Sequence, residues 1–350
     1  MISLLKLCFI FYILSDLGAY FEEINPSPIH EIMNTNLDQS LINSVDFHPK
    51  NNLFCVTFTH NNSIIIYKLN KDNTTSVFQI LKNPTSKLSC PQHALFSRDG
   101  TSLLVANWVN QTFNIYHSDL TGIYQSIPIA IIPFPYPTEN FRPHGIAFSQ
   151  DGNYLAVAYG ASKQDPKAIA IFQINDLANP DVNFKLVSLI QNSELDRGIP
   201  KGITFSPDGT CLLVTLSETN AVMIYKIDLL EEGIVCTPRQ IFQSPSSLLS
   251  RPEDIKFTID GNHIALSNSN KDTITFYLYD KENNYIMDES PSFTLENPRS
   301  QLNFPHGLAF SPDGNFLSVT QFGPVLFDKN SNLISWGTKR KDSVLIFKLN

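Results

Sequence analysis

The sequence predicts an all-β fold, a β-propeller of four-stranded antiparallel blades. An Asp–Gly pair recurs at intervals of 52 to 57 residues, at Asp99, Asp151, Asp208, Asp260 and Asp313. A short apolar strand precedes each pair and further strands follow it, with no helical periodicity between them. A four-stranded sheet cannot bury both of its faces alone, whereas radial packing of such sheets buries them and leaves only short edges.

The first copy of the repeat is degenerate. Phe47-His48-Pro49 is followed by Lys50-Asn51 where later copies carry Asp–Gly. Asparagine tolerates the positive φ that such a turn needs, so we expect Asn51 to take the place of the glycine. Counted with this copy, the sequence contains six inner strands. We therefore expect six blades, with seven as the alternative.

Each repeat contains four strands in order. In the repeats around Asp151 and Asp208, the first strand is typified by residues 146–149 and the second by residues 212–215. The third follows a polar loop, as in residues 222–227. The fourth is the weakest, as in residues 240–242. Alternating or continuous apolar runs of this length are typical of half-buried and buried strands.

The last repeat stops after its third strand, residues 344–349. Its fourth strand must come from elsewhere, and the N-terminal segment offers a candidate near Ala19 to Ile24. We expect residues 1–40 to supply this closing outer strand and residues 41–350 to form the propeller, so that deleting residues 1–25 lowers the melting temperature sharply. The alternative is that residues 1–20 are a secretory signal, with an apolar run after Lys6 and small residues near Ala19.

Composition excludes several classes of function. Only 17% of the residues are charged and the net charge is -8, which argues against a general binder of nucleic acids or anionic membranes. The five cysteines include no C-x-x-C pair, so neither a disulfide framework nor a cysteine zinc site is expected. We expect a cytoplasmic monomer with no membrane span and no cofactor. A secreted or periplasmic location applies if residues 1–20 are a signal peptide.

One column of the repeat varies in a way that suggests a site. Four residues before the phenylalanine of each copy stands a polar side chain, usually after a proline. Because this position enters the innermost strand, these side chains should ring one mouth of the central channel. The six residues are Asn43, Gln92, His144, Lys201, Glu253 and His306.

The loops after the second strands open on the same face and should add ligand-binding side chains. The candidates in these loops are Asn107, Trp108, Tyr159, Asn268 and Gln321. The candidate general acid/base residues are His144, Glu253 and His306, because imidazoles and carboxylates exchange protons readily. They also suit a divalent cation, but they come from different repeats and we assign no metal. The competing interpretation is that any propeller channel is wet and lined by polar residues.

The insert at residues 321–341 lengthens one loop of the last repeat. A β-hairpin flap over the channel mouth and an irregular surface decoration are both compatible with it, and we favour the decoration.

The repeat resembles the YVTN-type and lactonase-like β-propeller families. Their units carry an S-P-D-G turn, which residues 206–209 and 311–314 match in full, and then a strand such as L-x-V-x-N, which residues 103–107 match. The resemblance covers residues 41–350 and implies the propeller fold. Some lactonase-like propellers hydrolyse sugar lactones, and those enzymes usually have seven blades, while many relatives bind or act as scaffolds.

We therefore predict a propeller that recognises a protein or small ligand at one channel mouth. The alternative is a lactonase-like hydrolase acting on a sugar lactone. In that case His144, Glu253, His306 and Lys201 would activate water and hold the developing oxyanion.

Overall fold

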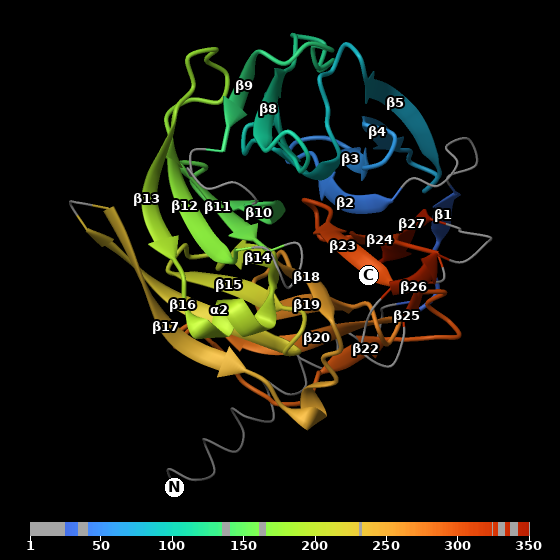
Figure 1. Ribbon diagram of the computed structural model, residues 1–350. Helices are drawn as coiled ribbons and strands as arrows, with labels where there is room; N and C mark the ends of the chain where they lie inside the picture. The colour runs from blue at the N-terminus through green and yellow to red at the C-terminus, as the bar shows by residue number, and fades with distance from the viewer. Residues whose placement is uncertain are drawn as a thin grey trace, which may run out of the picture.

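Six antiparallel sheets surround a common centre in the computed structural model, which confirms the expected six-bladed propeller (Figure 1). The structure describes residues 25–33, 41–134, 141–160, 166–230, 233–323, 325–327, 333–336 and 342–349. Consecutive strands of a blade lie side by side, from the channel outward.

The first strand of every blade faces the channel. The inner strands are β2 (Ile42–Phe47), β6 (Pro91–Phe96), β10 (Pro143–Phe148), β14 (Pro200–Phe205), β18 (Pro252–Phe257) and β23 (Pro305–Phe310). The second strands are β3 (Leu53–Phe58), β7 (Ser102–Asn107), β11 (Tyr154–Tyr159), β15 (Cys211–Leu216), β19 (His263–Asn268) and β24 (Phe316–Gln321).

The third and fourth strands build the outer part of each blade. The third strands are β4 (Ser63–Leu69), β8 (Thr112–His117), β12 (Ala168–Ile174), β16 (Ala221–Leu230), β20 (Thr273–Asp280) and β27 (Ser343–Lys348). The outer strands of the first four blades are β5 (Thr75–Lys82), β9 (Ala130–Pro133), β13 (Phe184–Ile190) and β17 (Gly233–Phe242). In the fifth blade, β21 (Tyr285–Ile286) and β22 (Phe293–Leu295) both pair with β20.

The N-terminal segment closes the ring, as expected. Strand β1 (His30–Met33) pairs antiparallel with β27 of the last blade, with His30 opposite Ile346 (Figure 1). Ile32 packs against the apolar cluster between the last and first blades, which gives this strand its inward face. The closing strand thus lies later in the chain than the segment near Ala19 to Ile24, and residues 1–24 fall outside the described part.

The insert of the last blade contains a hairpin. Strands β25 (Val325–Phe327) and β26 (Leu333–Trp336) pair antiparallel, so the favoured expectation of an irregular decoration was wrong for these residues. The one α-helix of the described residues, α2 (Ser193–Gly198), is a short turn between the third and fourth blades. No helix in the described ranges has the length and apolar character to cross a membrane.

Side-chain hydrogen bonds fix the Asp–Gly turns. In the fourth blade, Ser206 Oγ donates to Asp208 Oδ1 over 2.5 Å, the backbone N–H of Thr210 donates to the same oxygen, and Gly209 has φ of 73°. The degenerate first turn works differently. Asn51 is not in the positive-φ region, so that expectation was wrong, and its Oδ1 instead accepts the backbone N–H of Leu53.

The core is divided among the blade interfaces. Six clusters of buried apolar side chains each join two neighbouring blades. Near the axis the inner strands approach so closely that only glycine fits. A Cβ on Gly202 would lie 2.5 Å from Cα of Asp254 in the next blade. The glycine of the P-x-G motif therefore lets the strands converge around the channel.

Candidate active site

A break in register turns the predicted column of polar side chains toward the axis. In the third blade, Pro143 pairs with Tyr159 and Ile146 with Val157, so His144 and Gly145 lie opposite Ala158 alone. Such a β-bulge bends the strand and re-aims its side chains. The inner strands of the fourth, fifth and sixth blades break at the same place, after Pro200, Pro252 and Pro305.

Hydroxyl groups satisfy the backbone that the bulges leave unpaired. The N–H of Gly202 donates to Thr215 Oγ1 over 2.8 Å, and the N–H of Gly307 donates to Thr320 Oγ1 over 2.7 Å. Because a buried unpaired N–H costs about 1–3 kcal/mol, these bonds make the bulge a stable feature. The second strands thereby hold the site residues in place.

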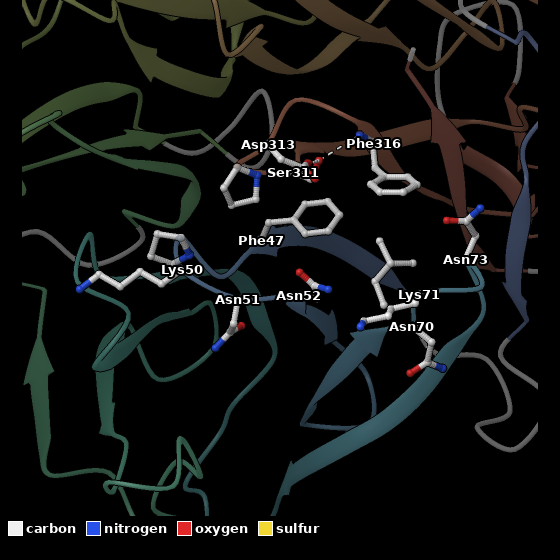
Figure 2. Close-up of a pocket in the computed structure, with 13 residues that line it drawn as sticks. Phe47, Lys50, Asn51, Asn52, Asn70, Lys71, Asn73, Ser311, Asp313 and Phe316 are labelled. Carbon is white, nitrogen blue, oxygen red and sulfur yellow. Dashed lines mark hydrogen bonds between the residues drawn. The ribbon is translucent and has the colours of Figure 1, made fainter.

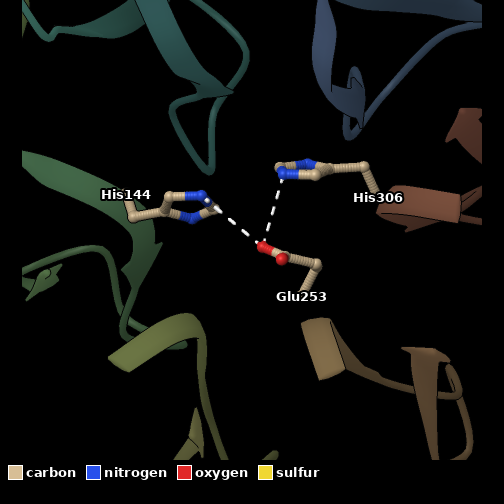
Figure 3. A group of neighbouring side chains, drawn as sticks. All are labelled: His144, Glu253 and His306. Carbon is tan, nitrogen blue, oxygen red and sulfur yellow. Dashed lines mark ion pairs between the residues drawn. The ribbon is translucent and has the colours of Figure 1, made fainter. Parts of the chain in front are cut away.

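Three of the predicted residues converge on one carboxylate oxygen. Glu253 Oε2 lies 3.7 Å from His144 Nε2 and 3.5 Å from His306 Nε2 (Figure 3). Lys201 Nζ lies 3.7 Å from the same oxygen. The Glu253 side chain is only 3% exposed, and its Oε2 has no hydrogen-bond partner among the described residues. One member of the six-residue ring, Glu253, thus presents an acceptor toward two imidazoles and an ammonium group.

Arg251 completes the site, and the alignment of the repeats did not reveal it. Its Nε donates to Glu253 Oε1 over 3.0 Å, and its Nη1 lies 3.6 Å from Glu218 Oε1. Arg251 stands in the loop just before the inner strand, outside the aligned column, and has φ of 54°. In the sequence, the only indication of its role is that this basic residue stands two positions before Glu253, the one acidic residue of the column.

A hydrogen bond fixes the tautomer of His306. Its Nδ1 lies 2.9 Å from the carbonyl oxygen of Asn43, which can only accept, so Nδ1 carries the proton. Burial lowers the pKa of His306, so the ring is neutral near pH 7. The lone pair of Nε2 therefore faces the carboxylate of Glu253, which is the geometry of a proton acceptor.

Burial and neighbouring charges set the other protonation states. Burial and then the Lys201 ammonium hold the pKa of His144 well below its usual range. Burial also lowers the pKa of Lys201. For Glu253, burial acts to raise the pKa, but Lys201, His306 and Arg251 outweigh it and the pKa is lowered. The site therefore combines an ionised carboxylate with two neutral imidazoles.

The space among these groups is small. A cavity of about 10 Å³ is lined by residues of the column and by those that follow them, and it is close to the minimum that holds one water molecule. The lining residues are Asn43, Gln92, His93, His144, Gly145, Gly202, Glu253, Asp254, His306 and Gly307. We call this end of the channel the histidine mouth.

The three ligand atoms of His144, Glu253 and His306 lie within 4.8 Å of one another, so these residues could hold a metal ion. Two histidines and a carboxylate suit a divalent transition metal. However, Lys201 and Arg251 already place two positive charges beside Glu253. A divalent cation would add further positive charge to a buried site in which Lys201 and Arg251 already balance the carboxylate of Glu253.

The remaining predicted residues have mainly structural partners. Asn43 Nδ2 donates to Gln92 Oε1 over 2.8 Å, which joins the first two blades. Three of the second strands end in a residue with a side-chain amide. The oxygen of each amide accepts a backbone N–H from the loop that leads into the adjacent inner strand. These pairs are Ser89 N to Asn107, Ser250 N to Asn268, and Asn303 N to Gln321.

Two aromatic candidates also lie near this face. The guanidinium of Arg142 stacks over the Trp108 ring at 4.7 Å from its centroid. Tyr159 is fully buried against Phe134 and Phe141, and its hydroxyl has no hydrogen-bond partner among the described residues. Their contact with a ligand stays a prediction.

The roomier hollows lie on the face of the Asp–Gly turns. One of about 460 Å³ lies between the first and last blades, where Phe47 and Phe316 flank Asn51, Asn52 and Lys71 (Figure 2). Its two lysines and its asparagines are mostly exposed side chains on turns. The second hollow, of about 380 Å³, lies on the axis, where the phenylalanine of every repeat contributes to its lining.

Comparison with known proteins identifies the family. Residues 32–246, more than half of the chain, match the family model described as "Lactonase, 7-bladed beta-propeller". The chain belongs to this lactonase family. The structure has six blades where the description of the family states seven. No curated protein sequence matches the chain.

Solved structures share the fold. A periplasmic gluconolactonase from Pseudomonas aeruginosa is 13% identical, with a TM-score of 0.59 and 88% of each chain covered. A protein from Lactobacillus plantarum is 14% identical, with a TM-score of 0.60 and 88% of each chain covered. The β-propeller domain of Cps50 from Myceliophteria thermophila is 12% identical, with a TM-score of 0.53, and 90% of this chain and 99% of that one covered. At these identities the similarity concerns the fold.

Proposed function

We propose that this member of the lactonase family is a hydrolase that opens the ring of a sugar lactone at the histidine mouth. The observation that carries the proposal is the buried Glu253 Oε2, which lacks a hydrogen-bond partner among the described residues and faces two neutral imidazoles. A desolvated acceptor beside a proton-accepting nitrogen is suited to activating water. Membership of the lactonase family supports the same reaction.

The chemistry follows from the protonation states. A water molecule beside Glu253 gives its proton to Nε2 of His306 as its oxygen bonds to the lactone carbonyl carbon. Glu253, 3.5 Å from that nitrogen, stabilises the imidazolium that forms. The carbonyl oxygen becomes an oxyanion, and the cations of Lys201 and Arg251 are the groups that stabilise it. The ring C–O bond then breaks, the ring oxygen takes the proton from the imidazolium, and a hydroxy acid leaves.

The charges of the site favour an uncharged substrate. Lys201 and Arg251 are both paired with Glu253, and Arg251 also approaches Glu218. A phosphorylated sugar would compete with these carboxylates for the same cations. We therefore expect the enzyme to prefer a neutral aldonolactone over its phosphate ester.

Recognition without turnover is the second candidate. It is favoured by the cavity of about 10 Å³, which is too small for a sugar ring, so that a ligand must lie over the mouth and not within it. In this case the polar ring would select a ligand without reacting with it.

A panel of lactones separates the two candidates. The purified chain is assayed for hydrolysis of five- and six-membered aldonolactones and their phosphate esters, with binding measured in parallel by calorimetry. The hydrolase proposal predicts turnover that His306→Ala and Glu253→Ala abolish and that His117→Ala, at the end of β8, leaves unchanged. Binding without turnover across the panel would support recognition. Turnover unaffected by both site variants would contradict the site.

A further inference from the structure

The floor of the histidine mouth differs from its rim. Each inner strand contributes a rim residue from the polar column and then, one position deeper, a floor residue. Three of the floor residues that line the small cavity are glycines of the P-x-G motif, Gly145, Gly202 and Gly307. The second and fifth blades carry His93 and Asp254 at this position, and both line the same cavity. The side chains at the floor of the cavity are therefore an imidazole and a carboxylate.

The carboxylate of the floor has its acceptors in use. Oδ1 of Asp254 lies 3.2 Å from Lys256 Nζ and accepts the backbone N–H of Ile255 over 2.8 Å. Oδ2 of Asp254 accepts the backbone N–H of Leu308 over 2.9 Å. These bonds join the fifth blade to the sixth, so Asp254 has a structural role.

The imidazole of His93 has one nitrogen in use and one without a partner. Burial lowers the pKa of His93 to about 3, against a hydrogen bond with the backbone of His144 that acts to raise it. Only a carbonyl acceptor has this raising effect, so the ring donates to the carbonyl oxygen of His144. Nε2 of His93 has no hydrogen-bond partner among the described residues. Nδ1 is therefore the donor, and Nε2 carries a lone pair.

Two buried acceptors in this cavity lack a hydrogen-bond partner. Among the described residues that line it, they are Nε2 of His93 and Oε2 of Glu253. Their residues are 5% and 3% exposed, and a buried acceptor without a partner is costly to the fold. A water molecule needs at least two polar partners and a space of about 10–15 Å³. The cavity of about 10 Å³ provides both.

We propose that His93 positions the water molecule that attacks the lactone, an inference that rests on the hydrolase function proposed above. The water donates one hydrogen to Nε2 of His93. It directs the other toward Glu253 Oε2 and His306 Nε2, which lie 3.5 Å apart (Figure 3). Because both hydrogens are engaged inside the cavity, the lone pairs of the water face the mouth, over which the lactone lies.

His93 holds the water without taking its proton. As the water oxygen bonds to the carbonyl carbon, the hydrogen that faces Glu253 and His306 passes to Nε2 of His306, which later returns it to the ring oxygen. The hydrogen that faces His93 stays on the new carboxylic acid, which releases it to solvent. A ring with a pKa of about 3 is too weak a base to compete for this proton, so His93 is a positioning residue.

Two substitutions separate the two nitrogens of His93. His93→Asn keeps a donor near the position of Nδ1 for the carbonyl of His144 but has no group at the position of Nε2. His93→Gln places an amide oxygen near the position of Nε2. For the lactone that the natural protein hydrolyses fastest, kcat should fall by about a hundred-fold in His93→Asn and by less than about ten-fold in His93→Gln. KM should change by less than about two-fold in both, because the lactone lies over the mouth.

The outcomes distinguish this role from the proposed function. A thermal melt first shows that each variant is folded at the assay temperature. Turnover by the natural protein with an undiminished kcat in His93→Asn, or with equal losses in both variants, overturns the role of His93 and leaves the hydrolase proposal standing. A raised KM with unchanged kcat overturns it too, because His93 would then contribute to binding the lactone. Absence of turnover by the natural protein contradicts the hydrolase proposal and, with it, the attack by this water.

A crystal structure tests the water site without an assay. At a resolution that shows ordered solvent, the natural protein should hold one water molecule at about 3 Å from both Glu253 Oε2 and His93 Nε2. In crystals of His93→Asn this water should be displaced or missing, and in His93→Gln it should be retained. An empty cavity or a metal ion in the natural protein overturns the proposal, as does an unmoved water in His93→Asn.

Discussion

Nδ1 of His306 lies 2.9 Å from the carbonyl oxygen of Asn43, so a side chain of the last blade is bonded to the backbone of the first. The hydroxyl of Thr320 donates to the same oxygen over 3.1 Å. The seam where the ring closes therefore also sets the tautomer of the proposed base. Loosening the seam should affect both stability and catalysis.

Truncation tests this link. Removing residues 1–35 deletes β1 and leaves the outer edge of β27 unpaired, whereas removing residues 1–25 retains β1. The longer deletion should therefore lower the melting temperature more than the shorter one, and should lower lactone hydrolysis with it. Equal melting temperatures of the two truncated proteins would show that β1 does not stabilise the closed ring.

Close packing around the axis gives a second prediction. In Gly202→Ala, the new Cβ would meet the backbone of Asp254 at 2.5 Å, and backbone cannot move aside as a flexible side chain would. Overpacking of this kind costs about 1–3 kcal/mol, which chemical denaturation measures. Gly209→Ala is the control, because nothing lies within 4 Å of its new Cβ and only its positive φ opposes the change. An equal or larger loss in the control would contradict the packing argument.

Asp46 should make stability depend on pH in a defined direction. Its pKa rises from 3.8 in the unfolded chain to about 6 in the folded protein, so the fold favours the protonated form. Stability should therefore fall as the pH rises from about 4 to 6 and stay lower above that range. Asp46→Asn should be more stable than the natural protein at pH 7 by about 1–3 kcal/mol, with the difference vanishing near pH 4. Denaturation at both pH values measures this, and a less stable Asn variant at pH 7 would contradict it.

The pH dependence of hydrolysis follows from the buried groups. Because burial lowers the pKa of His306 below 6.5, the ring stays a proton acceptor to lower pH than an exposed histidine does. The acid limb of kcat/KM should therefore lie below pH 6.5. Burial also lowers the pKa of Lys201 below 10.5, so activity should fall at high pH before an exposed lysine would titrate. An acid limb above pH 6.5 would exclude neutral His306 as the base.

Chelation tests whether the cluster works without a metal ion. Since Lys201 and Arg251 already neutralise Glu253, prolonged dialysis against EDTA should leave hydrolysis unchanged. Loss of activity that Zn²⁺ or Mn²⁺ restores would instead assign His144, Glu253 and His306 as ligands of a metal ion. Metal content measured before and after dialysis is the control.

Sequence patterns predicted the parts of the structure that recur in every blade. The Asp–Gly turn and the strands around it appear in the repeat, so the propeller and the polar column at its axis were predictable. The column reached the axis through a β-bulge after Pro143 and its equivalents, which spacing alone does not show. Asn51 departed from expectation because its side chain, and not a positive φ, stabilises the first turn.

Residues outside the shared pattern were beyond prediction. Arg251 directly precedes Pro252, and the equivalent residues of other copies, such as Cys90, Ile199 and Phe304, are of unrelated types, so the aligned position gives no sign of a site residue. Asn107, Asn268 and Gln321 did align, but their amides bond the backbone of neighbouring loops, a use that only the three-dimensional arrangement reveals. The axial hollow on the face of the Asp–Gly turns was hidden because its lining residues belong to the structural part of the repeat.

The rate of lactone hydrolysis by Glu253→Gln shows whether the carboxylate of the histidine mouth takes part in catalysis. Glutamine keeps the shape of the side chain and can still accept from Arg251, but it has no charge to stabilise an imidazolium. For the lactone that the natural protein hydrolyses fastest, kcat/KM at pH 7 should fall by about a hundred-fold or more, measured at a temperature where a thermal melt shows the variant to be folded. An undiminished kcat/KM in this variant would contradict the assignment of the histidine mouth as an active site.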